Sequence, residues 1–406
     1  MNRRVWGRLG AAMLGCLALV SVSAASAAAA PPGTVSVFAQ VGRPGFPALP
    51  HVVSDNVFEG TYDNPAGDSD PSKVFEYDAT GQLVNSWTVT GQDLSKPHGV
   101  QVAANDSRGR LVLLDKTSGR ILLLDPRTGE QTLYSRVPDL VQCSPLTISE
   151  ACSPTTTDQA PMPDYAAWGP DGSLYVTDYQ QAVIWRIPPG GGGPVVWLAD
   201  RRLDGGPFGT ACITMLPDHH TLLFDQASNG GLGGPNPSTG KLYKVEIESD
   251  GSPGPLHQLW ESGPADAPDG CAVSASGDIY IALVGAANQI VELDSGGHQI
   301  ATVGQAYTGD DGSSVPFDSP SGVAFFGSRL LIANQSYFAD NPANQAVLAL
   351  ETGEQGTPVY VPARAGLPPA SGKAKHKKHR HHRHKKHHKR KHHHRHHGHQ
   401  RRQARH

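Results

Sequence analysis

Several motifs that would assign an enzyme class directly are absent from this 406-residue sequence. It contains no G-x-S-x-G nucleophile elbow, no phosphate-binding loop and no C-x-x-C pair. These absences disfavour serine hydrolases of the elbow type, nucleotide enzymes and dithiol redox proteins. The sequence also lacks a long apolar stripe with a period of 3.6 residues, which argues against α/β folds. After residue 30, we expect no transmembrane segment.

Acidic residues are missing from the end of the chain, where none follows Glu354. Residues 371–406 contain 8 Lys, 7 Arg and 14 His, with two Ala as the only apolar residues. Such a segment cannot bury enough surface to offset its conformational entropy, so we predict a disordered basic tail over residues 363–406. The chain's net charge of −3 therefore conceals −21 on residues 31–370, because residues 1–30 carry +3 and residues 371–406 carry +15.

The first thirty residues have the pattern of an export signal. Arg3, Arg4 and Arg8 precede an apolar run over residues 9–22, and small residues at 23–30 provide an A-x-A cleavage site. We expect a signal peptide over residues 1–30 and a secreted or extracytoplasmic mature protein. The Arg3-Arg4 pair leaves a twin-arginine signal open as an alternative export route.

Residues 34–362 contain a repeated pattern of strands. The most regular element is a short apolar strand after a turn, found at residues 110–115, 173–178, 221–225, 278–282 and 329–334. Each follows a strand that opens with a Pro or Gly turn and precedes two more strands, and a divergent unit at residues 50–87 adds a sixth copy. Six such meanders of about fifty-five residues predict an all-β fold, a six-bladed β-propeller of four-stranded antiparallel blades. Residues 35–38 and 359–361 compete as the closing strand of the last blade.

Five cysteines are present, and four remain once Cys16 leaves with the signal. An even number suits an oxidising compartment. Cys143 and Cys152 bracket an eight-residue loop, and we predict a disulfide there. Cys212 and Cys271 fall in inner strands of adjacent blades, where they either form a second bridge or remain free thiols.

The repeats resemble a known family. Pro-Asp-Gly at 268–270, Ser-Gly-Asp-Ile-Tyr at 276–280 and Val-Glu-Leu-Asp at 291–294 are similar to motifs of the gluconolactonase/regucalcin family, which includes luciferin-regenerating enzyme, and of neighbouring NHL-repeat propellers. The resemblance implies one divalent ion in the axial channel, held by a Glu of the first blade, an Asn of the middle blades and the Asp of Pro-Asp-Gly. Such an ion would polarise a lactone carbonyl or activate a water molecule.

The sequence matches this ligand set only in part. Asp269 lies in Pro-Asp-Gly and matches the family, whereas Asp164 is an imperfect match for a substrate-contacting Asn. Thr210 and Ala211 stand where the resemblance places an Asn ligand. Glu59 lies in the second strand of its blade, although the family's Glu opens an inner strand.

The residues that follow the turn prolines are expected to face the channel axis: His98, Asp164, Phe208, Asp269 and Ser321. Carboxylates and imidazole suit divalent ions, so we predict that Asp269, Asp164 and His98 bind Ca²⁺ or Zn²⁺, with Asp269 also catalytic. Ser321 and Phe208 are predicted to contact the ligand. The alternatives are a turn-forming role for Asp269, a metal-free channel lining for Asp164 and a hydrogen-bonded channel residue for His98.

Two functional hypotheses follow. The first is a secreted, lactonase-like propeller that binds a small ligand in its channel and hydrolyses a lactone or related ester. The second is a non-catalytic propeller that binds carbohydrate or protein outside the cytoplasm. In both, we expect a monomer without specific nucleic-acid binding, whose tail contacts metal ions or an anionic cell-surface polymer through its cations and its many histidines, among them His381, His382, His392, His393 and His394.

Overall fold

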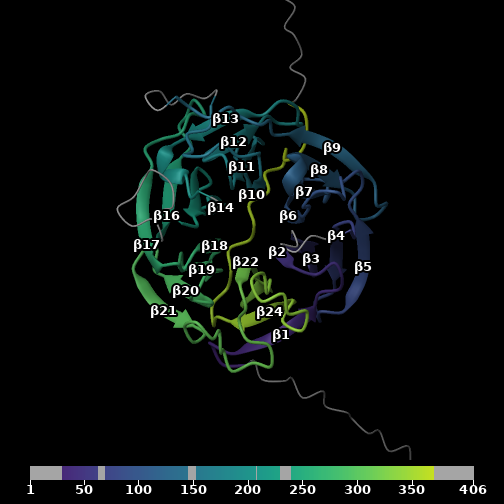
Figure 1. Ribbon diagram of the computed structural model, residues 1–406, viewed down its shortest axis with the longest axis vertical. Coiled ribbons are helices and arrows are strands. Elements are labelled where there is room, and N and C mark those ends of the chain that lie inside the picture. The colour runs from purple at the N-terminus through teal and green to yellow at the C-terminus, as the bar shows by residue number, and fades with distance from the viewer. Residues whose placement is uncertain (1–29, 63–68, 145–151, 207, 229–238, 370–406) are drawn as a thin grey trace, which may run out of the picture. The chain divides into compact units, whose positions relative to one another are not determined.

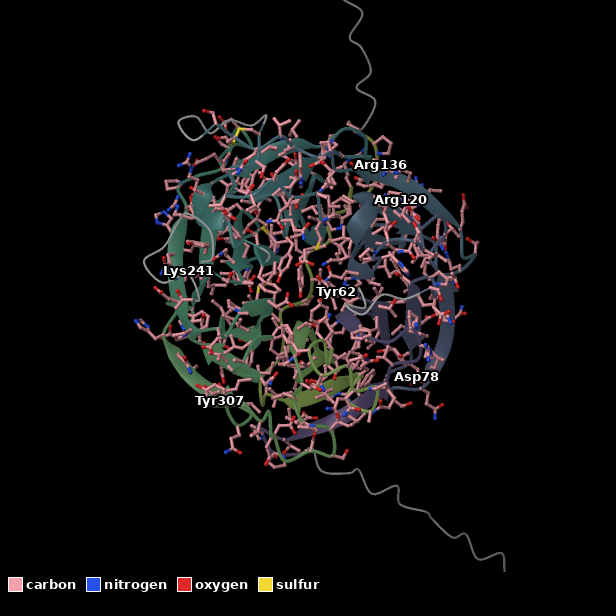
Figure 2. All side chains as sticks on the ribbon, in the orientation of Figure 1. Tyr62, Asp78, Arg120, Arg136, Lys241 and Tyr307 are labelled. Carbon is pink, nitrogen blue, oxygen red and sulfur yellow. A yellow bond between two sulfur atoms is a disulfide. The ribbon has the colours of Figure 1, made fainter. Side chains whose placement is uncertain are left out.

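The fold was analysed in a computed structural model, which describes residues 30–62, 69–144, 152–206, 208–228 and 239–369. Six four-stranded antiparallel sheets are arranged around a central axis, which confirms the predicted six-bladed β-propeller (Figure 1). Figure 2 places the side chain of Tyr62 near this axis, whereas Asp78, Arg136 and Lys241 lie near the perimeter. None of the helical turns in the described part of the chain has the length or the apolar character of a membrane span.

The blades follow one another along the chain, with the first strand of each nearest the axis. Blade 1 consists of β2 (Pro47–Val53), β3 (Asn56–Thr61), β4 (Lys73–Tyr77) and β5 (Leu83–Thr88). Blade 2 consists of β6 (Val100–Asn105), β7 (Leu111–Asp115), β8 (Arg120–Leu124) and β9 (Gln131–Arg136). Blade 3 consists of β10 (Pro163–Trp168), β11 (Leu174–Asp178), β12 (Val183–Ile187) and β13 (Val195–Ala199).

The second half repeats this order. Blade 4 consists of β14 (Thr210–Met215), β15 (Thr221–Gln226), β16 (Thr239–Glu246) and β17 (His257–Pro264). Blade 5 consists of β18 (Pro268–Val273), β19 (Ile279–Leu283), β20 (Gln289–Leu293) and β21 (Gln299–Val303). Blade 6 consists of β22 (Pro320–Phe326), β23 (Arg329–Asn334), β24 (Ala346–Glu351) and β1 (Val35–Gln40). Two short 3₁₀ turns, η1 (Lys116–Ser118) and η2 (Arg201–Leu203), lie between strands.

The ring is closed by the N-terminal strand. β1 pairs antiparallel with β24 and becomes the outer strand of blade 6. Of the two closing strands that the sequence allowed, residues 35–38 therefore fill the place, and residues 359–361 do not. Closure of this kind completes the four strands of the last blade and joins the two ends of the ring through one sheet.

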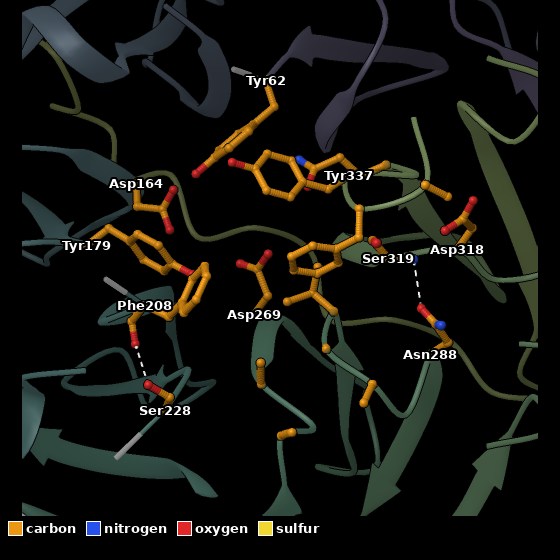
Figure 3. Close-up of a pocket in the computed structure, with 18 of the residues that line it drawn as sticks. Tyr62, Asp164, Tyr179, Phe208, Ser228, Asp269, Asn288, Asp318, Ser319 and Tyr337 are labelled. Atoms are coloured by element: carbon orange, nitrogen blue, oxygen red, sulfur yellow. Dashed lines mark hydrogen bonds between the residues drawn. The ribbon is translucent and has the colours of Figure 1, made fainter. Parts of the chain in front are cut away.

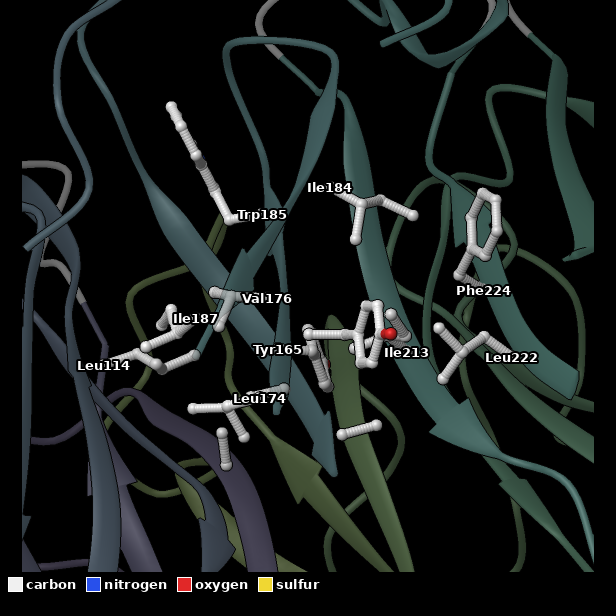
Figure 4. Close-up of a cluster of buried hydrophobic side chains, with 14 of the residues drawn as sticks. Leu114, Tyr165, Leu174, Val176, Ile184, Trp185, Ile187, Ile213, Leu222 and Phe224 are labelled. Atoms are coloured by element: carbon white, nitrogen blue, oxygen red, sulfur yellow. The ribbon is translucent and has the colours of Figure 1, made fainter. Parts of the chain in front are cut away.

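The core lies between neighbouring blades, where both faces of the inner strands are covered. All five residues of β7 and of β11 are buried, which explains why these strands read as continuous apolar runs. Figure 4 shows part of the largest cluster, in which Trp185 and Leu114 pack with residues of blades 3 and 4. The indole N–H of Trp185 donates to Asp178 (2.9 Å), so this buried ring keeps its polar group satisfied.

A strap formed by residues 352–369 runs across one end of the axis (Figure 1). Thr357 donates its backbone N–H to Val273 of blade 5, and Ala365 accepts from the backbone N–H and the hydroxyl of Ser107 next to blade 2. Tyr360 stacks on His219 with ring centroids 4.2 Å apart and packs against the ends of the first strands. The strap therefore covers this end of the channel. The predicted start of the tail, residue 363, falls inside the strap, and the predicted histidine contacts from His381 to His394 lie outside the described residues.

Two disulfides are present. Cys143 and Cys152 are bonded as predicted. Cys212 and Cys271 are bonded as well and join the first strands of blades 4 and 5. The alternative of buried free thiols is therefore excluded.

Candidate functional site

A cavity of about 1030 Å³ opens at the end of the axis opposite the strap. At this end the first strand of each blade begins and the second strand ends, so the loops that precede the first strands and the loops that follow the second strands converge on the axis (Figure 3). Propellers commonly place ligand sites where such loops meet a rigid scaffold. The cavity lining is contributed by blades 1, 3, 4, 5 and 6.

Asp164 and Asp269 owe their positions to β-bulges. The register of β10 against β11 shifts between Pro163 and Ala166, and that of β18 against β19 shifts between Pro268 and Cys271. Each aspartate lies inside the shifted segment, where the ladder is interrupted and a side chain is redirected. Both line the cavity, and Figure 3 shows the Asp269 carboxylate pointing into its centre.

The Asp269 carboxylate is held by a buried tyrosine. The Tyr165 hydroxyl donates to Oδ1 of Asp269 at 3.0 Å. Burial raises the pKa of Asp269 to about 6, while the Lys116 ammonium and the Tyr165 hydroxyl oppose this rise. At neutral pH the carboxylate is therefore largely ionised, yet it is more basic than an exposed aspartate.

A second carboxyl lies behind this group. Asp225, at the end of β15, is fully buried and accepts from the backbone N–H of Cys212 at 2.9 Å. Its other oxygen has no hydrogen-bond partner among the described residues. Burial, and then the charge of Asp269, raise the pKa of Asp225 well above its ordinary value.

Lys116 brings a positive charge to the base of the site. It begins the turn η1 after β7, is fully buried and forms an ion pair with Asp164. Its ammonium lies 4.3 Å from the ring centroid of Tyr62 and 5.8 Å from that of Tyr179. Because both members of the pair are buried, loss of either one would leave the other as an uncompensated buried charge.

Aromatic rings form much of the cavity wall. Tyr62 and Tyr337 pack edge to face with centroids 5.9 Å apart, and Tyr337 and Phe338 do so at 5.3 Å. Across the cavity, Tyr179 and Phe208 are 6.4 Å apart, also edge to face. These rings come from the loops that follow the second strands and from the loop that precedes β14 (Figure 3).

Several residues of this wall have an unfavourable backbone conformation. Positive φ angles occur at five non-glycine residues that line the cavity: Ala265, Ala267, Asn288, Tyr307 and Ser319. Such conformations persist only where the surrounding structure enforces them, and they concentrate at functional sites. The backbone of this cavity is therefore shaped at some cost in stability.

The structure brings three of the five predicted channel residues together. Asp164, Phe208 and Asp269 line the cavity, whereas His98 and Ser321 do not. The ring nitrogens of His98 lie 2.9 Å from the Lys96 carbonyl oxygen and 2.7 Å from that of Asp70. The Ser321 hydroxyl donates to backbone carbonyls of neighbouring strands.

Glu59 also lies away from the cavity. It is fully buried, and its Oε1 accepts from the backbone N–H groups of Ala48 and Leu49 at 2.7 and 2.8 Å. These donors lie in the bulge of β2, where the ladder leaves them without strand partners. Burial raises the pKa of Glu59 to about 8.

The predicted metal ligands do not form an open donor set. Asp164 is paired with Lys116, and the His98 nitrogens contact carbonyl oxygens, so of the three predicted ligands only Asp269 lines the cavity without an ion-pair partner among the described residues. A divalent ion requires several oxygen or nitrogen donors within about 2.0–2.6 Å. The residues present therefore do not fit the predicted ion in this arrangement, and the ammonium of Lys116 supplies the positive charge beside Asp164.

Sequence reasoning missed Lys116, Tyr62 and Tyr179. Each directly follows a second strand, at the position also held by Val284 and Gln335. Of these five residues, all but Lys116 line the cavity. The residue directly after each second strand is therefore a sequence signal for the cavity wall, in addition to the turn prolines.

A search of solved structures gives the fold but no closer relationship. A calcium-binding protein, regucalcin, from Agrobacterium tumefaciens is 18% identical, with 81% of this chain and 99% of that chain covered and a TM-score of 0.52. Luciferin-regenerating enzyme is 12% identical, with 83% and 100% covered and a TM-score of 0.52. A gluconolactonase from Xanthomonas campestris is 15% identical, with 79% and 98% covered and a TM-score of 0.46.

The likeness to regucalcin and luciferin-regenerating enzyme confirms the fold expected from the repeats. A scan against models of protein families gives no match, and a search of curated proteins gives none either.

Proposed function

We propose that the protein is an exported hydrolase of the lactone or ester class, in which the axial cavity binds a small molecule and Asp269 acts as the general base. The observation that carries the proposal is the placement of the Asp269 carboxylate, which projects from a bulge into the centre of the cavity. The two disulfides support export, because such bonds persist in oxidising compartments.

Asp269 has the properties that such a base requires. Its pKa of about 6 keeps it ionised at neutral pH while leaving it basic enough to accept a proton from water. The activated water attacks the carbonyl carbon, and the proton then passes from Asp269 to the leaving alkoxide as the C–O bond breaks. The products are a carboxylic acid and an alcohol, or a hydroxy acid when the substrate is a lactone.

Tyr165 and Lys116 act through Asp269. The Tyr165 hydroxyl occupies Oδ1 and so directs Oδ2 toward the cavity. The Lys116 ammonium limits the rise in the pKa of Asp269 and forms an ion pair with Asp164 at the base of the site. The Ca²⁺ or Zn²⁺ ion expected from the sequence stays a prediction, and no step of this mechanism passes through it.

The proposal is tested with a panel of lactones and carboxylic esters and the purified mature protein. We expect hydrolysis by the wild type and a loss of at least about a hundredfold in Asp269→Asn, the usual range for general-base removal. Asp266→Asn is the matched control, because Asp266 lies three residues earlier and is not part of the cavity lining. Elemental analysis of the same sample tests for the divalent ion.

Two outcomes would refute the proposal. The first is a wild-type protein that hydrolyses none of the panel. The second is hydrolysis that persists unchanged in Asp269→Asn. The second functional hypothesis, a binding propeller without turnover, expects ligand binding in the cavity together with the first outcome.

We further propose that the basic tail contacts an anionic cell-surface polymer. The support is its composition, with 15 Lys and Arg and 14 His over residues 371–406 and no acidic residue. Retention on cell walls is compared between the full chain and a chain ending at Leu367, at about pH 5.5 and 7.5 and over a salt series, because histidine charges between these values. Equal retention of both chains under every condition would refute this role.

A further inference from the structure

We propose that the cavity takes a ligand carrying an organic ammonium group, a protonated or quaternary amine, held between aromatic rings and aspartates. This inference deepens the proposed function by naming the class of its substrate. It rests on the composition of the cavity wall, the geometry of the rings and the balance of charge.

The cavity wall combines aromatic and acidic residues and has no basic ones. Six aromatic rings line it, from Tyr62, Tyr179, Phe208, Tyr307, Tyr337 and Phe338. Asp164, Asp269 and Asp318 supply three carboxyl groups, and no lysine, arginine or histidine occurs among the described residues that line the cavity. The face of an aromatic ring carries partial negative charge and attracts cations, so this combination favours a positively charged ligand over a neutral or an anionic one.

The charges at the site do not balance. Lys116 is paired with Asp164, whereas Asp318 has no ion-pair partner in the part of the chain that the structure describes. Instead, the Ser336 hydroxyl and the Asn344 amide donate to Oδ2 of Asp318 at 2.6 and 2.9 Å. These neutral donors fix the carboxylate in the wall and leave its charge for the ligand. With Asp269 largely ionised at neutral pH, an anionic ligand would be repelled.

Neighbouring rings of the cavity wall lie with their planes nearly perpendicular. The interplanar angles are 77° between Tyr62 and Tyr337, 89° between Tyr337 and Phe338, and 73° between Tyr179 and Phe208. Rings whose planes meet near right angles line several sides of a volume rather than one, which suits a compact cation. A flat sugar ring would instead be matched by a single broad stacking face.

The protein already holds one ammonium group by the same means. Lys116 places its Nζ over the faces of Tyr62 and Tyr179 and completes its coordination with the Asp164 carboxylate. The outer rings, Phe208 and Phe338, are 39% and 66% exposed. Apolar rings exposed at the mouth of a cavity indicate a surface that a ligand covers. The cavity wall thus has the same kinds of group, aromatic rings and carboxylates, as those that surround the Lys116 ammonium.

The test compares probes that have the same shape and differ in charge. Binding of choline and of its neutral isostere, 3,3-dimethylbutan-1-ol, is measured by titration calorimetry on the mature protein at neutral pH. We expect choline to bind at least about tenfold more tightly, as a desolvated cation–π contact allows. Phe338→Leu and Asp318→Asn are each expected to reduce the affinity for choline severalfold and to leave that for the alcohol unchanged. Tyr360→Leu, in the strap at the opposite end of the axis, is the control and is expected to change neither.

Hydrolysis of two matched esters separates this inference from the proposed function. Acetylcholine and 3,3-dimethylbutyl acetate share the ester and differ in the charged group, and we expect a higher kcat/KM for acetylcholine. Hydrolysis of both at equal kcat/KM, dependent on Asp269, would overturn the ammonium inference and leave the hydrolase proposal standing. Selective choline binding without hydrolysis of either ester would support the ammonium inference and count against the hydrolase proposal. Equal binding of choline and the alcohol, or binding of neither, would overturn the ammonium inference.

Discussion

Replacement of Lys116 by methionine tests the role of the buried ion pair at the base of the site. Methionine has a similar length and no charge, so Lys116→Met leaves the Asp164 carboxylate buried without its partner. Removal of one member of a buried pair costs about 3–5 kcal/mol in free energy of unfolding, because the remaining charge is desolvated and uncompensated. We expect a loss of this size at neutral pH.

A second variant separates the lost charge from the lost packing. In Lys116→Met/Asp164→Leu, the uncompensated carboxylate is removed as well, and apolar groups fill the space. Replacement of a complete buried pair by apolar residues of similar volume is often neutral or stabilising. We therefore expect the double variant to recover most of the stability that the single variant loses.

Urea unfolding with both disulfides intact provides the assay, monitored by the fluorescence of the buried Trp168 and Trp185. The control is Arg127→Met, which removes the partner of Asp125 from an exposed pair whose arginine is 72% exposed. An exposed pair of this kind contributes about 0–1 kcal/mol. If Lys116→Met destabilises the protein no more than Arg127→Met does, the reasoning about a buried, coupled cation is refuted.

Three further predictions follow from the groups described above. Hydrolysis by the wild type is expected to rise with pH through about 6 as Asp269 ionises. Lys116→Met is expected to move this rise to higher pH, because the Lys116 ammonium lowers the pKa of Asp269. A rate of hydrolysis that does not change between about pH 5 and 7 would contradict the assignment of Asp269 as the base. Glu59 has a folded-state pKa of about 8 against an ordinary 4.5, so between these pH values the unfolded state releases a proton that the folded state keeps, and the free energy of unfolding falls as pH rises. Glu59→Gln is expected to reduce this dependence on pH in urea unfolding, and an unchanged dependence counts against the pKa shift. Cys212 and Cys271 are separated by 59 residues, and Cys143 and Cys152 by 9. Serine substitution is expected to lower the free energy of unfolding by about 4 kcal/mol when it removes the Cys212–Cys271 bridge and by about 2.5 kcal/mol when it removes the Cys143–Cys152 bridge. The reverse order in thermal or urea unfolding would contradict a chain-entropy origin.

The repeats were readable from the sequence because each blade buries both faces of its inner strands. The apolar run of β7 and the turn prolines before β10 and β18 are local signals, and local signals fixed the number of blades and most strand positions. The same turns located Asp164 and Asp269, since both lie in bulges that directly follow a proline.

The same rule failed for two residues for identifiable physical reasons. In blade 2 the first strand begins at Val100, two residues after His98, and its register shift occurs farther along, between Val102 and Ala104. His98 therefore lies outside the strand and contacts backbone carbonyls. Ser321 has the expected position, but its short side chain is buried and donates to the carbonyls of Ala48 and Ala333.

Lys116 and the aromatic wall could not be assigned from local pattern alone. The segment around Lys116 has the composition of an ordinary turn, and its partner Asp164 is 48 residues away in the next blade. Whether a lysine after a strand reaches solvent or a buried carboxylate depends on this long-range pairing. Only the folded ring brings the two residues together.

The strap covers the end of the axis opposite the cavity, which limits a ligand to one entrance. Val359 and Tyr360 of this segment lie against the ends of the first strands, so the passage around the axis is covered at one end and open at the other. In the hydrolase proposed above, a substrate and the product formed from it use this one entrance in turn. For an enzyme built in this way, the departure of a product that retains the group recognised by the wall delays the arrival of the next substrate, and accumulating product competes directly for the entrance.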